Sequence, residues 1–203
     1  MKLQFTIMLL IFWTISFAQE NAIIKLAFSD KTNFDITTFL DHKKPTVFYV
    51  LKKTDKWNIY RFHMDKDLTS DSVRKRLERD EYSPYNHSYI FRDTVISRLF
   101  SDSEKQRLFN HTKAIQPKEL ADTFKVFKLI KSFSAAKIGF FFSVSEPIFT
   151  QDKQFAFVDI ITYKKDKETK KLNYAYFGTT IIIYQYIEGK GWTRIKKRDH
   201  LLL

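Results

Sequence analysis

The C-terminal part of the chain is a series of β-strand patterns, and this series restricts the fold more than any other feature. Each segment is rich in β-branched and aromatic residues and is bounded by turn-forming or charged residues, as strands are. The segments are Thr123–Lys131, Ile138–Val144, Gln154–Tyr163, Asn173–Ile187 and Trp192–Arg198. Their connections, among them Thr150–Lys153 and Glu188–Gly191, include some short enough for hairpins. Because strands joined in this way run antiparallel, we predict an antiparallel meander.

Three consecutive isoleucines, Ile181–Ile183, lie within the fourth of these segments. Successive side chains of a strand point to opposite faces, so this run places apolar groups on both faces of the sheet. Such a strand at an exposed edge would promote aggregation. We therefore expect it inside the sheet, covered on both sides.

Upstream of these strands, strand and helix patterns alternate. We predict a hairpin from Thr46–Lys53 and Trp57–His63, and helices over Ser72–Asp80, Asp93–Phe100 and Asp102–Thr112. Ser101 and Glu104 stand at the spacing of a capping box, which would start the last helix. We expect one α+β domain over residues 19–203. It would contain an antiparallel sheet of about five to seven strands packed by two or three helices.

Residues 1–18 have the pattern of a secretory signal peptide. Lys2 is followed by an apolar run, and the small residues Ser16 and Ala18 precede the polar residues that follow. The run has about fifteen residues, whereas a membrane-spanning helix needs about 20. We therefore expect cleavage between Ala18 and Gln19, and export to the periplasm or the medium. The alternative is an uncleaved anchor. Later apolar runs have strand lengths, so we predict no membrane span after signal removal.

The chain contains no cysteine. A lipid-anchored bacterial precursor needs a cysteine directly after its cleavage site, so the sequence excludes that form of anchoring. Disulfides are excluded as well, although an exported protein could form them. A thiol nucleophile and a thiolate metal site are also excluded. The hydrophobic core must therefore hold the fold without covalent support.

The chain is strongly basic, with a formal net charge of +12. Lys2 is the only charged residue of the leader, so the mature chain keeps +11. This excess favours anionic partners such as lipid head groups or acidic polysaccharide, and export argues against nucleic acid. The alternative is a solvated basic surface. The candidate anion-binding residues are Arg74, Lys75, Arg76, Arg79, Arg194, Lys196, Lys197 and Arg198.

Known catalytic and metal-binding motifs are absent from the sequence. It contains no G-x-S-x-G, H-E-x-x-H, P-loop or dinucleotide-binding pattern. The histidines are His42, His63, His87, His111 and His200, and none has a histidine partner three or four residues away. We predict no cofactor and no metal site.

Asp159 is the one candidate catalytic residue. Alternation along its strand places it on the same face as Phe157. A carboxylate there needs a hydrogen bond, a cation or solvent. If the strands are in register at Tyr163 and Tyr174, Gly178 lies opposite this carboxylate and leaves a small notch. Asp159 would then be a ligand contact or a general base. The alternative is a structural carboxylate that is bonded to a lysine, a tyrosine or a backbone amide.

Several aromatic residues near the C-terminus allow two interpretations. They are Tyr174, Tyr176, Tyr184, Tyr186 and Trp192. They could form a stacking platform for sugars or other planar ligands. They could equally form cross-strand pairs that stabilise the sheet, and we favour this second interpretation.

Part of the chain resembles a loose family of exported bacterial proteins of unassigned function. The resemblance rests on Leu99-Phe100-Ser101-x-x-Glu104, Ser145-x-Pro147-Ile148-Phe149-Thr150-x-Asp152, Phe155–Val158, Gly178 and Gly191-Trp192. It covers about half of the mature chain and implies a shared fold and export, without implying any chemistry. The family would lead one to expect a cysteine near Gly178, and this chain has none.

Three functional hypotheses follow. The first is an exported, non-enzymatic protein associated with the cell envelope, with no specific partner indicated. The second is a small hydrolase-type enzyme whose carboxylate site is assembled at Asp159 by folding. The third is a binder of anionic envelope surfaces that uses the basic residues named above.

Overall fold

The computed structural model describes residues 18–33, 48–57, 59–62, 90–121, 127–136, 139–165 and 175–201. The predicted helix Ser72–Asp80 lies outside the described residues, as does most of the leader. Among the residues that are described, no helix is long and apolar enough to cross a membrane.

Strands are the most abundant regular element of the described chain. They are β1 (Phe48–Leu51), β2 (Phe127–Ile130), β3 (Gly139–Val144), β4 (Ile148–Phe149), β5 (Phe155–Lys165), β6 (Ala175–Ile187) and β7 (Gly191–Leu201). The α-helices are residues 18–29, α4 (Thr94–Ser97) and α5 (Asp102–Ala114). Short 3₁₀ helices are η1 (Lys31–Asn33), η3 (Ile59–Phe62), η5 (Ile90–Arg92) and η6 (Phe133–Ala135). These elements confirm an α+β fold.

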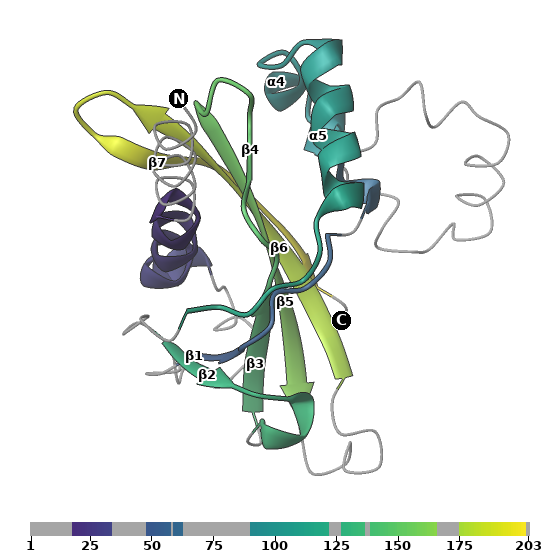
Figure 1. The fold of residues 1–203 in the computed structure, drawn as a ribbon, viewed down its shortest axis with the longest axis vertical. Coiled ribbons are helices and arrows are strands. Elements are labelled where there is room, and N and C mark those ends of the chain that lie inside the picture. Colours follow the sequence, from purple (N-terminus) through teal and green to yellow (C-terminus); the bar gives the residue numbers. More distant parts are fainter. Residues whose placement is uncertain are drawn as a thin grey trace, which may run out of the picture.

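The strands form one seven-stranded sheet in the order β2-β1-β3-β5-β6-β7, with β4 also paired to β5. From β3 to β7 the neighbours are antiparallel, which confirms the later part of the predicted meander (Figure 1). Its first segment, Thr123–Lys131, contains β2, which pairs with β1 instead of β3. However, β1 runs parallel to both β2 and β3. The sheet is therefore mixed, and the prediction of a purely antiparallel sheet was wrong.

The predicted N-terminal hairpin does not form, which explains the error. Its second segment contains the 3₁₀ helix η3 instead of a strand. Trp57 and Phe62 are buried in a cluster beneath α5, where their rings meet edge to face at 5.2 Å. Burial of these aromatic rings outweighs the β propensity of the segment. Consequently, β1 pairs with strands that are distant in sequence.

Ile181–Ile183 lie where the pattern predicts. They belong to β6, which lies between β5 and β7. Ile182 packs in the core on one face of the sheet, and Ile181 and Ile183 pack in the core on the other. This confirms an interior strand that is covered on both sides.

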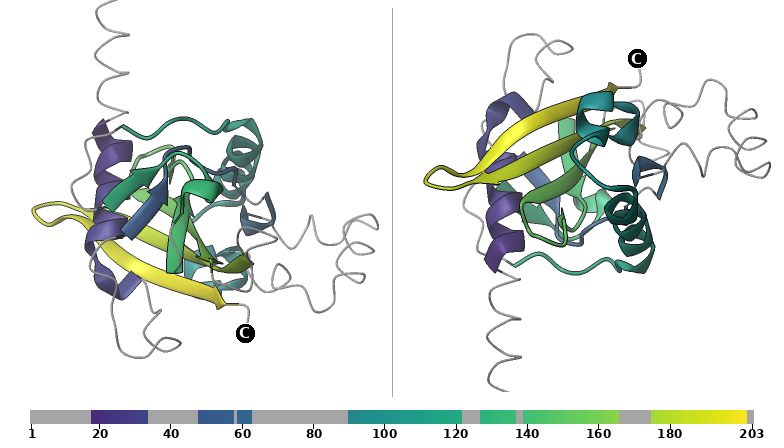
Figure 2. Two further views of the ribbon diagram at one scale, coloured as in Figure 1. Left: turned by 90° about the horizontal axis from the view of Figure 1, so that it is seen from below. Right: turned by 90° about the horizontal axis from the view of Figure 1, so that it is seen from above.

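Helices cover both faces of the sheet. Figures 1 and 2 show helix 18–29 on one face, and α4 and α5 on the opposite face. On the first face, Ile24 and Phe28 are about 1% exposed and pack with Phe142 of β3. On the second face, Leu108 and Phe157 are fully buried in a separate cluster. Helix 18–29 was not predicted from the sequence, although its buried residues have helical spacing.

An ion-pair network ties helix 18–29 to the rest of the domain. Lys118 Nζ lies 2.5 Å from Glu20 Oε2 and 3.1 Å from Glu146 Oε1. Burial acts to lower the pKa of Lys118, but the hydrogen bonds that Lys118 donates to both carboxylates outweigh burial and raise this pKa above its ordinary value. The charged form of Lys118 is therefore favoured in the folded protein.

The predicted capping box is half present. Ser101 is the N-cap of α5, and its Oγ accepts a hydrogen bond of 3.2 Å from the backbone amide of Glu104. The Glu104 carboxylate does not complete the box. It forms a two-pronged ion pair with Arg107 and accepts a hydrogen bond from the amide of Gln151. Glu104 thereby joins the start of α5 to the turn before β5.

Candidate functional site

Asp159 lies in a closed polar cluster between two apolar regions of the sheet. Its side chain is paired with Arg61 of η3, at 3.3 Å between Nε and Oδ2. Thr179 of β6 donates a hydrogen bond to the other carboxylate oxygen. The backbone amide of Asp159 donates to Ser145 Oγ at 2.9 Å. Asp159 is 3% exposed and Arg61 is 2% exposed.

The predicted notch beside Asp159 is wrong. Tyr163 pairs with Tyr176, and a register shift occurs between Thr162 and Tyr163. Asp159 therefore faces Ile181, whereas Gly178 pairs with Thr162. The partner of Tyr163 already lies two residues beyond the predicted one, and the irregularity adds one more, an effect that hydrophobic alternation alone does not reveal. A large aliphatic side chain thus lies opposite Asp159.

A second polar region opens to solvent close to the end of β1. It is a pocket of about 590 Å³ between residues 51–56, the turn that contains η6, and β5. We call it the lysine pocket. Its lining residues are Leu51, Lys53, Thr54, Asp55, Lys56, Pro117, Lys131, Ser132, Phe133 and Tyr163.

Backbone hydrogen bonds fix one wall of the lysine pocket. The amide of Thr54 donates to the Lys118 carbonyl at 2.8 Å, and the amide of Asp55 donates to the Val144 carbonyl at 2.9 Å. Thr54 Oγ1 in turn accepts from the amide of Lys118. Residues 54 and 55 are thus hydrogen-bonded to two separate segments of the chain. These bonds fix the backbone that carries the side chains of this wall.

The opposite wall is held by β5. Lys165 Nζ donates to the carbonyl oxygens of Ser134 and Ala136, which lie in and after η6. Phe133 packs edge to face against Tyr163, with ring centroids 5.1 Å apart. The turn is thereby attached to the sheet by both polar and aromatic contacts.

Asp55 supplies the carboxylate of the pocket. Its Oδ1 accepts from the backbone amide of Lys56 at 2.9 Å. Its Oδ2 accepts from Ser143 Oγ at 3.0 Å and from the Tyr163 hydroxyl at 3.4 Å. Asp55 itself is partly exposed. These three hydrogen bonds therefore orient the carboxylate, while part of it still faces the pocket.

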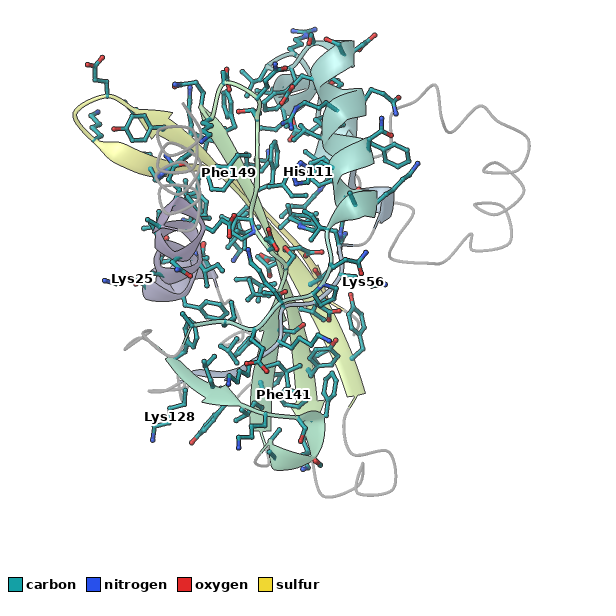
Figure 3. All side chains as sticks on the ribbon, in the orientation of Figure 1. Lys25, Lys56, His111, Lys128, Phe141 and Phe149 are labelled. Carbon is teal, nitrogen blue, oxygen red and sulfur yellow. The ribbon has the colours of Figure 1, made fainter. Side chains whose placement is uncertain are left out.

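Three lysines line the pocket together with this carboxylate. Lys53, Lys56 and Lys131 are exposed, and in the described part of the chain none of them forms an ion pair. Figure 3 shows Lys56 on the side of the molecule that carries α5, whereas Lys25 and Lys128 lie on the other side. Asp55 is the only carboxylate among the described lining residues, so this part of the pocket carries a positive charge.

The basic residues of β7 are differently placed. Arg194 pairs with Asp30 at 2.9 Å, Lys196 with Asp93 at 2.7 Å, and Lys197 with Asp199 at 2.9 Å. The hydrogen bond from Lys196 is the main reason why the pKa of Asp93 lies below its ordinary value. Arg198 lines a small apolar hollow with Ile90 and Asp93. Arg74, Lys75, Arg76 and Arg79 lie outside the described residues. Anion binding by either set stays a prediction.

The aromatic residues near the C-terminus lie in different places. Tyr184 is buried in the core beneath helix 18–29, and burial raises its pKa to about 12. Tyr176 packs against Tyr163 on the opposite face. Tyr186 and Trp192 form a cross-strand pair with centroids 5.5 Å apart. Tyr174 lies outside the described residues. The four described aromatics thus pack in cores and cross-strand pairs, as we favoured.

Another hollow, of about 480 Å³, lies between the start of α5 and the turn before β5. Its two carboxylates are engaged by neighbours within the fold. Glu104 pairs with Arg107, and Asp152 accepts from Thr150 Oγ1 and from the amide of Gln154. This hollow is therefore a structural junction. Throughout the described ranges, no group of three or more potential metal ligands comes together.

The lysine pocket could not be predicted from the sequence because its parts come from separate elements. Lys53, Asp55 and Lys56 follow β1, Lys131 follows β2, and Tyr163 lies in β5. The sequence distance between these parts leaves no local motif, and residues 54–56 have the composition of an ordinary turn.

Comparison with known proteins adds no further assignment: no family model, no curated protein and no solved structure matches the chain.

Proposed function

We propose that this chain is an exported protein of the cell envelope that binds an anionic ligand in the lysine pocket, without catalysing a reaction. The observation that carries the proposal is the group of three lysines, Lys53, Lys56 and Lys131, which have no ion-pair partner in the described structure. By contrast, three basic residues of β7 have carboxylate partners within the fold.

Electrostatics support this assignment. Like charges held close together repel one another, and an anion bound between them relieves that repulsion. The overall positive charge of the chain would also draw anionic ligands toward it. The walls of the pocket are held by backbone and aromatic contacts, so little ordering is needed on binding. Anionic envelope components are the partners that fit this charge and the predicted compartment.

A hydrolase that uses Asp159 has less support. A general base must come within hydrogen-bond reach of its substrate. Asp159 is 3% exposed and is occupied by Arg61 and Thr179. Its surroundings are those of a structural ion pair.

Replacing Lys53, Lys56 and Lys131 together with glutamine tests the binding proposal. The probes are oligogalacturonate, inorganic phosphate and phosphatidylglycerol vesicles, measured by calorimetry or vesicle sedimentation at low and moderate salt. We expect at least one probe to bind, more weakly as salt rises. At about 0.5–1 kcal/mol for each exposed charge contact, the triple variant should bind that probe about ten- to a hundredfold more weakly.

The matched control replaces Lys25, Lys153 and Lys190 with glutamine. These lysines are exposed and lie outside the pocket lining, and their replacement changes the net charge by the same amount. This variant should keep most of the affinity. An equal loss in both variants would mean that the ligand responds only to overall charge. Failure of all three probes to bind would overturn the proposal.

Export is tested at the predicted cleavage site. When the chain is expressed with residues 1–18 in a bacterial host, we expect a product that starts at Gln19 outside the cytoplasm. Ala18→Phe should block processing because the residue before the cleavage site must be small. Ala18 is exposed, so this change leaves the core intact. Mass spectrometry of the N-terminus provides the measurement, and a mature chain that begins at Met1 would refute export by cleavage.

A further inference from the structure

We infer that the ligand of the lysine pocket is an acidic saccharide, that is, a sugar that carries a carboxylate or sulfate together with free hydroxyl groups. This inference rests on the proposed function and deepens it. The feature that carries it is Asp55, the single carboxylate that the described lining residues contain beside the three lysines. A site for a purely anionic ligand would be stronger without a negative charge in its lining.

Asp55 has acceptor capacity left for a ligand. A carboxylate offers about four lone-pair sites. Oδ2 accepts two hydrogen bonds, from Ser143 and Tyr163, whereas Oδ1 accepts one, from the backbone of Lys56. A ligand hydroxyl can donate to the remaining site on Oδ1, but a phosphate or carboxylate group would be repelled there. The pocket therefore combines cations for an anionic group with an acceptor for hydroxyls.

The aromatic side of the pocket suits a sugar ring. Phe133 is partly exposed, and its ring is held by edge-to-face contacts to Phe141 and Tyr163 at 5.8 and 5.1 Å. The C–H face of a pyranose can pack on such an apolar ring. A volume of about 590 Å³ is within the range of small-molecule pockets. Cations, one hydroxyl acceptor and an aromatic wall together match an acidic saccharide of a few units.

Asp55→Asn separates a saccharide from a simple anion by the sign of its effect. The asparagine carbonyl can still accept from Ser143, but the amide NH2 then takes the place of Oδ1, so the acceptor for a ligand hydroxyl is lost. We expect oligogalacturonate to bind about tenfold more weakly, because a hydrogen bond to a charged group contributes about 1.5–3 kcal/mol. Phosphate should bind about threefold more tightly, because one negative charge has been removed. Calorimetry with both probes measures the two changes.

Two further variants complete the test. Glu188→Gln removes a negative charge at the exposed turn between β6 and β7, and it should leave both affinities nearly unchanged. Phe133→Leu should weaken oligogalacturonate binding severalfold while sparing phosphate. Retained phosphate binding shows in each case that the pocket is still folded, and urea denaturation checks the stability of each variant.

Distinct outcomes identify which proposal fails. Equal or tighter binding of oligogalacturonate to Asp55→Asn would overturn the saccharide inference and leave anion binding in place. The same conclusion follows if phosphate or phosphatidylglycerol vesicles bind the wild type while neither oligogalacturonate nor heparin oligosaccharides do. If no anion binds, the proposed function itself fails. A neutral galacto-oligosaccharide serves as the uncharged control probe. If it binds with the same affinity as oligogalacturonate, the lysines are irrelevant and the inference is overturned.

Discussion

Replacing Arg61 with methionine is expected to lower the free energy of unfolding by about 3–5 kcal/mol, since one partner of a buried ion pair is removed. Arg61 and Asp159 are both almost completely buried, and their side chains meet at 3.3 Å. Without the guanidinium, the Asp159 carboxylate keeps its hydrogen bond from Thr179 but loses the neighbouring cation. Urea denaturation followed by circular dichroism measures the loss.

Arg98→Met is the matched control for this change. Arg98 is exposed at the end of α4, so the same replacement should change stability by about 0.5 kcal/mol or less. The double variant Arg61→Met with Asp159→Asn removes both buried charges and should recover part of the loss. A cost below about 1 kcal/mol for Arg61→Met would contradict a structural role for the pair. It would reopen the hypothesis of a functional Asp159.

Replacing Phe28 with alanine is expected to cost about 3–5 kcal/mol, as for other buried phenylalanines. Phe28 is 1% exposed and lies in helix 18–29, as the tenth residue after the predicted cleavage site. Its ring centroid lies 4.7 Å from that of Phe127 in β2 and 6.3 Å from that of Phe142 in β3. Truncation would leave a cavity between the helix and the sheet. The experiment therefore asks whether the segment after the leader is part of the core.

Thermal and urea unfolding of the chain from Gln19 onward measure this effect. Leu99→Ala is the control, because Leu99 is 47% exposed and its truncation should cost less than about 1 kcal/mol. Phe28→Leu keeps most of the buried volume and should recover much of the stability. If Phe28→Ala were as stable as Leu99→Ala, helix 18–29 would not contribute to the core in solution.

The strands of the C-terminal part could be predicted because their signal is local. Alternating apolar residues and turn chemistry mark each strand, and hairpin connections place consecutive strands side by side. Gly139–Val144, Phe155–Lys165, Ala175–Ile187 and Gly191–Leu201 accordingly lie close to their predicted bounds. The N-terminal half was harder because its β1 pairs with β2, about eighty residues farther along the chain. Local propensity does not report such a parallel pairing.

The environment of Asp159 was only partly predictable. Alternation correctly placed this carboxylate on the face that also carries Phe157, and physical chemistry required a partner for it. The sequence could not indicate that Arg61 is that partner, because the two residues are 98 positions apart. Nor could it locate the register shift that puts Ile181 opposite Asp159.

By itself, the sequence determined the α+β character of the domain, the meander of its C-terminal strands and the absence of disulfides. These properties depend on residue composition and on short-range periodicity, which each segment carries independently. Only the tertiary structure decided that the sheet is mixed, that helix 18–29 belongs to the core, and that Asp55 lies among Lys53, Lys56 and Lys131. Those outcomes arise from pairing between distant segments, where burial and hydrogen bonding across the whole chain outweigh local preference.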